Sequence, residues 1–298
     1  MATSFPTGKK ILLGREIAYM INQAGCSQAQ AAAFIETSPA RIAGLIKGQG
    51  TISVGDLERL ATKLGFTNEN YIEMLQELRR DNHRRGFWIT GYRRAYAEDV
   101  RLLVTLEELA DELRSVDVEV MPGLTQCESY IRALHEQPDA DTHPHCPTAE
   151  DSVRARLARQ EVLARHDPPT FSAVISESAL RRIYGGREVM LQQLEHLMTL
   201  SQRPNVQIQV MPFDVTPPRM SMAYHYVLLT VPSPGAAGPL HMAYVESEGS
   251  DIRYLDDKEA FAARDSAWRR LTATALSPAD SAKFMEDVAR SFRRKSFK

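Results

Sequence analysis

The sequence is short of several features, and each shortage excludes a class of protein. It has 3 cysteines among 298 residues, and Cys26, Cys127 and Cys146 lie far apart. Scattered cysteines in odd number argue against a disulfide framework and are typical of a reducing compartment, so we expect a cytoplasmic protein. No apolar run approaches the roughly 18 residues of a membrane span, and the N-terminal apolar stretch is too short for a secretory signal. We therefore expect no membrane association.

Motifs typical of catalytic or metal-binding sites are also scarce. The chain has no G-x-S-x-G nucleophile elbow and no H-E-x-x-H zinc motif. The possible metal ligands are His135, His143, His145, Cys146 and Cys127, but their spacing matches no zinc pattern and two prolines predict a flexible loop. We therefore expect no enzyme activity, no cofactor and no metal site.

The net charge is small but unevenly distributed. The whole chain has a formal charge of −2. Residues 1–94 carry 13 Lys and Arg against 8 Asp and Glu, a net charge of +5, and residues 95–298 carry 23 against 30, a net charge of −7. This asymmetry favours a mildly basic, DNA-facing module joined to an acidic body, and the alternative is ordinary scatter between two domains.

Apolar periodicity and capping residues predict a group of short helices near the N-terminus. The expected helices span 11–24, 28–35, 39–47 and 54–64. Gly25 ends the first helix, and Ser27 with Gln30 forms a capping box for the second. Ser38 caps the third helix and Pro39 occupies its first position, where proline is well tolerated. Local sequence therefore defines an all-α N-terminal domain.

The succession of caps, apolar stripes and stops over residues 10–70 resembles the helix-turn-helix domain of lambda-repressor-like regulators of the xenobiotic-response-element (XRE) class. The class pattern stands here as Ser27-Gln28, Ala31-Ala32, Glu36-Thr37-Ser38, Ile42-Ala43, Ile46 and Gly48. The resemblance implies that the third helix enters the major groove of double-stranded DNA while Gln28 and Lys47 reach the phosphate backbone. The residues that we expect to contact DNA are Ser27, Gln28, Thr37, Ser38, Ala40, Arg41, Ala43 and Lys47.

The third helix departs from the pattern of that class. Glu36 stands where the turn usually has a glycine. Pro39, Ala40 and Gly44 replace longer side chains, so few groups remain for bidentate base contacts, each worth about 1–3 kcal/mol. We expect phosphate contacts to dominate, with a thymine methyl against Ala40 or Ala43, and a dimer on two half-sites. The alternative is a helical domain kept for packing or dimerisation.

A basic segment follows a predicted helix at 68–80. Residues 79–94 contain six arginines, interleaved with Phe87, Trp88 and Tyr92. Such a segment could follow a phosphate backbone, dock an acidic partner, or serve as a solvated linker whose aromatics pack on the next domain. We accordingly expect a helix-turn-helix domain at 1–70, a helical basic linker at 71–98, and a larger domain at 99–298.

The larger domain mixes helical and strand patterns. The expected helices span 97–113, 124–136, 151–165, 187–201, 257–275 and 278–294. The expected strands span 114–121, 170–176, 205–213, 224–231, 242–247 and 251–256. Short turns between strands predict an α+β fold with an antiparallel or mixed sheet and terminal helices. In the strand at 224–231, Tyr224 and Tyr226 should share one face.

Two long motifs in this domain resemble a large actinomycete family. Residues 120–134, V-M-P-G-L-T-Q-C-E-S-Y-I-R-A-L, are similar to its V-P-G-L-L-Q-T-x-D-Y-A-R-A signature, and residues 185–213 to a second signature that ends in R-P-N-V-x-V-Q-V-x-P-F. The resemblance covers nearly all of 95–294. It implies Scr-type antitoxin-like transcriptional regulators, which join an XRE-class helix-turn-helix to a C-terminal domain of unknown biochemical activity and often have a small co-encoded partner protein.

Together these features predict a sequence-specific DNA-binding transcriptional regulator that acts as a homodimer. A small partner protein or a ligand would modulate it through the C-terminal domain. The alternative is an antitoxin-like interaction module that sequesters a partner and for which DNA binding is secondary.

Overall fold

The computed structural model describes residues 6–80, 96, 98–136, 148–216, 218, 222–247 and 251–294. The chain divides into two compact units. The first unit comprises Met1–Gly91, Arg101–Leu109 and Val231–Leu240. The second unit comprises Tyr92–Val100, Ala110–Thr230 and His241–Lys298. The domain boundaries at 70 and 98 stay predictions.

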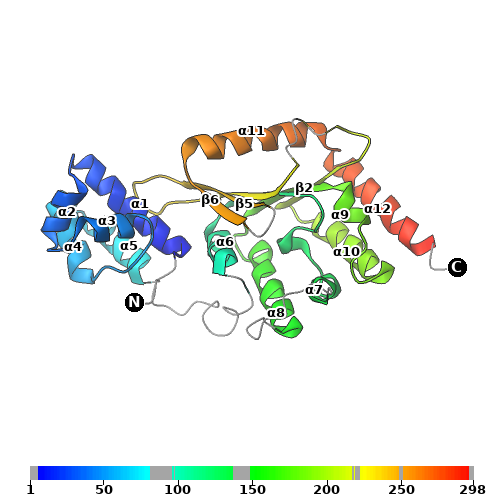
Figure 1. Cartoon of the computed structure of the whole chain (residues 1–298), viewed down its shortest axis with the longest axis horizontal. Coiled ribbons are helices and arrows are strands. Elements are labelled where there is room, and N and C mark those ends of the chain that lie inside the picture. Colours follow the sequence, from blue (N-terminus) through cyan, green and yellow to red (C-terminus); the bar gives the residue numbers. More distant parts are fainter. Residues whose placement is uncertain are drawn as a thin grey trace. The chain divides into compact units, whose positions relative to one another are not determined.

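Five helices make up most of the first unit (Figure 1). They are α1 (Gly8–Gln23), α2 (Gln28–Phe34), α3 (Pro39–Ile46), α4 (Val54–Lys63) and α5 (Glu69–Arg80). Each corresponds to a helix that the sequence predicts. Their apolar stripes meet in a core whose largest side chains at no more than 1% exposure are Ile17, Met20, Ile42, Leu57, Leu60 and Leu75. The predicted all-α N-terminal fold is confirmed.

Two distant parts of the chain complete the first unit. From α6 (Glu98–Leu109), Thr105 accepts a hydrogen bond at Oγ1 from the backbone N–H of Gly8, at 3.1 Å. A Cβ at Gly8 would lie 2.7 Å from Leu109 Cδ1, so glycine permits this close approach. Residues 231–240 are the second distant part, and the sequence predicts neither contact.

Within the described residues, the second unit contains a six-stranded sheet of order β3-β2-β1-β4-β5-β6. The strands are β1 (Glu112–Asp117), β2 (Thr170–Ser176), β3 (Val206–Met211), β4 (His225–Val231), β5 (Leu240–Ser247) and β6 (Asp251–Leu255). β2 pairs in parallel with β1 and β3, whereas β1 with β4 and β5 with β6 are antiparallel. The sheet is therefore mixed, and the predicted α+β fold is confirmed.

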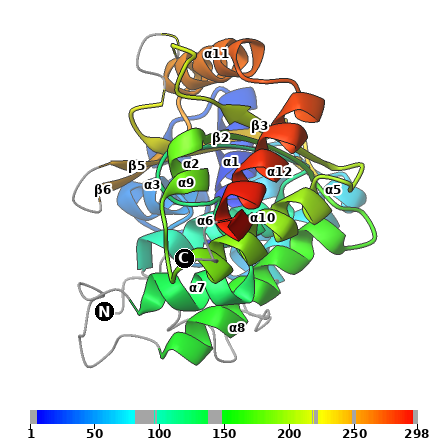
Figure 2. The ribbon, with the colours of Figure 1, turned by 90° about the vertical axis from the view of Figure 1, so that its right-hand side faces the viewer.

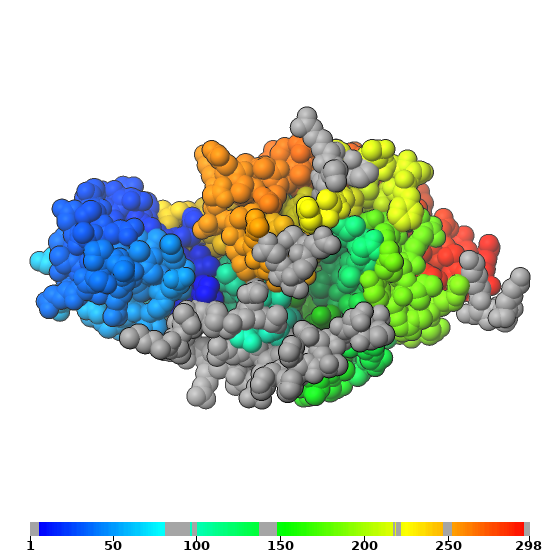
Figure 3. Space-filling model, viewed as in Figure 1, coloured from blue at the N-terminus to red at the C-terminus, as the bar shows by residue number. Residues whose placement is uncertain are grey.

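Helices cover both faces of the sheet (Figures 1 and 2). α11 (Lys258–Thr274) lies on one face, where Trp268 and Leu271 join a core with Val116, Tyr226 and Leu228. Its outward side, in orange, forms part of the surface in Figure 3. On the other face lie α7 (Glu128–His135), α8 (Ala149–Gln160) and α10 (Arg187–Leu200). The terminal helix α12 (Pro278–Arg294) packs against α10 and β3, as expected for a terminal helix.

The predicted helix at 97–113 and the strand at 114–121 are wrong at their boundaries. α6 ends at Leu109, and β1 begins at Glu112 and ends at Asp117. The reason is tertiary pairing, because the buried Leu113 lies between Phe171 of β2 and Leu229 of β4. A residue with strand partners on both sides is held in the sheet despite a helical sequence pattern.

Three smaller predictions in this unit also need correction. The helix predicted from 124 starts at Glu128, after the 3-10 helix η2 (Gly123–Thr125). The helix predicted at 151–165 ends at Gln160, where the 3-10 helix η3 (Glu161–Ala164) follows, and the short α9 (Glu177–Arg181) was not predicted. Tyr224 and Tyr226 do not share a face, because Tyr224 precedes β4 and is 56% exposed whereas Tyr226 is 5% exposed in the core.

Candidate nucleic-acid interface

Side-chain caps fix the starts of α2 and α3. Ser27 Oγ accepts a hydrogen bond from the N–H of Gln30 at 3.2 Å, and Gln30 Oε1 accepts one from the N–H of Ser27 at 2.9 Å. Ser38 Oγ accepts from the N–H of Arg41 at 3.2 Å, and Pro39 is the first residue of α3. These bonds satisfy donors that every helix start leaves without a backbone partner. Both predicted caps are confirmed.

The turn between α2 and α3 depends on one left-handed residue. Glu36 has φ 53°, and it is the one non-glycine residue with positive φ among the residues that the structure describes. This is the position at which the XRE-class pattern has glycine. Because a side chain in this conformation is sterically costly, the turn forms here at the expense of local strain. The helix-turn-helix bend is nevertheless present.

The eight predicted contact residues lie at the start of α2, in the turn and along α3. Ile42 and Leu45 are buried at 0% and 5% exposure. The opposite side of α3 therefore faces outward. The exposed members are Ser27, Gln28, Ser38, Ala40, Arg41 and Lys47. Thr37 and Ala43 are half-buried. Their contact with DNA stays a prediction.

Several of these residues are already engaged within the protein. The Ser27 hydroxyl donates to Gln30 Oε1 at 2.9 Å while it accepts the capping bond, so its proton is used in the capping box. Arg41 Nη2 donates to the carbonyl of Thr51 at 3.2 Å, which turns its guanidinium toward the segment that follows α3. The outward face of α3 therefore offers few free polar groups for reading bases.

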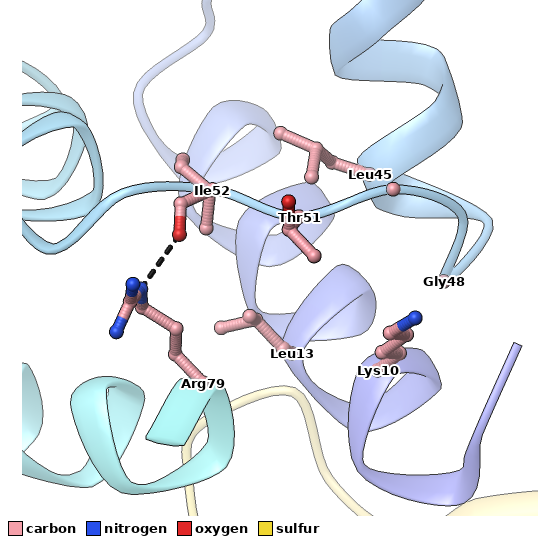
Figure 4. Close-up of a pocket in the computed structure, with 8 residues that line it drawn as sticks. Lys10, Leu13, Leu45, Gly48, Thr51, Ile52 and Arg79 are labelled. Carbon is pink, nitrogen blue, oxygen red and sulfur yellow. Dashed lines mark hydrogen bonds between the residues drawn. The ribbon is translucent and has the colours of Figure 1, made fainter. Parts of the chain in front are cut away.

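A small pocket lies beside the segment between α3 and α4 (Figure 4). Gly48, Thr51 and Ile52 from that segment line it with Lys10 of α1 and Arg79 of α5. Arg79 Nε donates to the carbonyl of Ile52 at 2.6 Å, and burial lowers the pKa of Lys10. The sequence predicts Arg79 only as part of the basic segment at 79–94 and gives no sign of Lys10, because neither residue is near the α3–α4 segment in sequence. Residues 81–94 of the basic segment lie outside the described residues.

The two family-like motifs of the second unit are joined by a buried glutamine. Gln193 is 0% exposed, and its Nε2 donates to the carbonyl of Thr125 at 2.7 Å while its Oε1 accepts from the N–H of Cys127 at 2.7 Å. Gln160 Nε2 donates to the carbonyls of Gly123 and Gln126 at 3.2 and 2.8 Å. These contacts give the motifs a structural role in fixing η2 and α7.

An ionic pair crosses the sheet of the second unit. His225 Nδ1 lies 3.0 Å from Asp117 Oδ1, and Asp117 is 2% exposed. The Ser115 hydroxyl also donates to the Asp117 carboxylate. Burial lowers the pKa of His225, but the Asp117 carboxylate outweighs it, so the pKa of His225 is raised. Charge on the histidine therefore stabilises the contact between β1 and β4.

Within the described residues, no group of three His, Cys, Asp or Glu side chains is arranged to hold a metal ion. The H-P-H-C stretch lies outside those residues. None of the described helices is both long and apolar enough to cross a membrane.

The fold and the exposed side of α3 define the class of protein: a helix-turn-helix unit followed by an α+β unit. A family model described as Helix-turn-helix matches residues 17–72, which include α2 and α3. A second, Domain of unknown function (DUF5753), matches residues 100–287, more than half of the chain. The chain thus belongs to the DUF5753 family, and it is a DNA-binding transcriptional regulator of the helix-turn-helix kind. No curated protein and no solved structure matches it.

Proposed function

We propose that the protein binds specific sites on double-stranded DNA with α3 in the major groove and α2 against the phosphate backbone. The exposed side of α3, with Ala40 and Arg41 in its first turn and Lys47 at its C-terminal end, is the observation that supports this. Because Ala40 and Ala43 have no hydrogen-bonding side-chain group, phosphate contacts supply most of the affinity and few bases are read directly.

We further propose that the protein acts as a homodimer. One helix that reads few bases gives a weak interface, and two copies on half-sites about 34–36 Å apart would double it. The symmetry of such a dimer requires an operator with two related half-sites.

We propose that the second unit is a regulatory body of the Scr-type, antitoxin-like kind, as the actinomycete family resemblance implies, and not an enzyme. Residues 95–298 carry a net charge of −7, which suits a protein surface for a small co-encoded partner, or a ligand site, better than a second DNA contact. No cofactor or metal is needed for this function, which would take place in the cytoplasm. An antitoxin-like module that sequesters its partner is the second candidate, and the sparse polar face of α3 favours it.

Alanine at both Gln28 and Arg41 tests the proposed phosphate contacts. We expect weaker binding to every duplex, and a salt slope that is shallower by about 0.9 for each phosphate that the variant no longer neutralises. The measurement is a gel-shift titration at several salt concentrations with the protein's own upstream DNA and with unrelated DNA. The variant with alanine at Gln202 and Arg290 removes the same groups from exposed positions of the second unit and should bind as the unmodified chain does.

The same titration separates the two candidate functions. A regulator in its own right shifts its upstream DNA without any other protein. Sequestration as the main function predicts no shift with the purified chain alone, and unchanged binding by the Gln28 and Arg41 variant would contradict the proposed interface.

A further inference from the structure

Residues 232–239, which join β4 to β5, are bound to α1 through the side chain of Glu16. This carboxylate is 0% exposed. It accepts hydrogen bonds from the N–H of Ala236 and of Ala237, both at 3.1 Å, and from the Ser233 hydroxyl at 2.8 Å. Tyr71 of α5 adds a fourth donor at 2.7 Å, and burial followed by this bond raises the pKa of its phenol, so it remains a donor. We call residues 232–239 the latch.

The neighbouring side chain holds the latch from its carbonyl side. Arg15 Nη2 lies 3.2, 3.4 and 3.0 Å from the carbonyl oxygens of Ala237, Gly238 and Pro239. Two adjacent residues of α1 thus bind both the donors and the acceptors of one backbone segment. A buried carboxylate is costly unless donors surround it, so Glu16 is stable where it lies only while the latch is in place.

The latch also fits Glu16 sterically. A Cβ at Gly235 would lie 2.5 Å from the Glu16 carboxylate, so only glycine allows the backbone to approach this closely. Beside the latch a pocket remains between α1, α5 and the prolines at 232 and 234, lined in part by Leu12 and Met74. The hydrogen bonds to Arg15 and Glu16 therefore hold the latch beside a space that apolar side chains do not fill.

The latched part of α1 lies directly beside the end of α3. A Cβ at Gly14 would lie 2.4 Å from the carbonyl oxygen of Ile46 and 2.5 Å from that of Leu45, so the α1 backbone supports the last turn of α3. Gly14 immediately precedes Arg15 and Glu16. A displacement of α1 at the latch therefore alters the support of α3.

We propose that the latch is a coupling device that keeps α1, and through it α3, in the form that binds DNA. This inference rests on the proposed function of α3. Because the latch is covalently continuous with β4 and β5, a partner or ligand that acts on those strands can reach the DNA interface by releasing it. Linkage then requires the reverse effect, so DNA binding tightens the latch.

The first experiment measures amide hydrogen exchange in the full chain without DNA. In Glu16→Gln the amides of Ala236 and Ala237 no longer have a charged acceptor and should exchange about tenfold faster or more. Gly235→Ala should also accelerate exchange at these two amides, because the added methyl group would displace the latch from Glu16. The controls are Glu73→Gln, at an exposed position of α5, and Gly55→Ala, in α4 with open space around it. Unchanged exchange at Ala236 and Ala237 in both latch variants would overturn the latch.

The second experiment measures coupling with a duplex selected from a random-sequence pool by the unmodified chain. Both latch variants should bind this duplex about tenfold more weakly than their controls, and the duplex should slow latch exchange in the unmodified chain. Faster exchange combined with unchanged affinity would refute the coupling. If the unmodified chain selects no duplex, the proposed function fails and the coupling with it, whereas the exchange rates still decide whether the latch exists.

Discussion

Glu36 shows how a single backbone angle shapes the DNA-facing unit. Its φ of 53° lies in the left-handed region, where a residue with a side chain costs about 1–2 kcal/mol. The carboxylate is 3.7 Å from Arg59, but both side chains are more than half exposed, so this ion pair offsets little of the cost. The free-energy cost of the turn is therefore offset by the packing of the rest of the helical core.

Replacing Glu36 with glycine should relieve that strain. We expect the free energy of unfolding of the first unit to rise by about 0.5–1 kcal/mol, since glycine adopts positive φ freely. Urea unfolding, with amide exchange in α1 and α5 as the local probe, measures the change. Glu36→Ala is the matched control, because it removes the ion pair but keeps the strain. Equal stability of the two variants would show that the turn is not strained.

The roles of residues whose partners are close in sequence were predictable. The roles of residues whose partners lie far away in sequence were not. Ser27, Gln30 and Ser38 cap the helices that the sequence predicts, because capping depends on neighbours three positions away. Glu16 gives no such signal, since its donors at 233–237 are more than 200 residues away. For the same reason Lys10 was not predicted to line a pocket with Arg79.

Among the elements, the sheet shows where the local sequence pattern predicts strand boundaries correctly and where it does not. β2 has the predicted bounds because its apolar residues are flanked by turn residues. β1 was misplaced because Leu113 owes its conformation to partners on β2 and β4, which a local pattern does not contain. β1 and β4 are further joined by the pair of Asp117 and His225.

That pair makes the stability of the sheet depend on pH. The raised pKa of His225 means that its stabilisation is fully present below about pH 6.5, the ordinary value for histidine, and disappears as the pH rises through the raised pKa. His225→Gln should therefore cost about 1.5–3 kcal/mol near pH 6 and less at higher pH. Urea unfolding across a pH series tests this. The exposed His166→Gln is the control for the substitution, and a cost that grows with pH would contradict the assignment.

For the whole molecule, the sequence predicts that an all-α fold precedes an α+β fold. It does not predict that two later segments of the chain belong to the first unit. The helix-turn-helix and DUF5753 matches agree with an all-α front and an α+β body. The return of residues 231–240 to the first unit was not predictable, because a short connection between strands gives no local sign of a distant partner. This segment is continuous with β4 and β5 and binds α1, whose backbone supports α3, and the proposed coupling depends on this connection.

Hydroxyl-radical footprinting of the selected duplex tests whether two copies of the chain cover two half-sites of the sugar-phosphate backbone, as a dimer with α3 in the major groove requires. We expect two protected patches about 10–10.5 base pairs apart, centre to centre, which weaken together when Gln28 and Arg41 are alanine. A single patch, or protection that is unchanged in that variant, would contradict the proposed dimer interface.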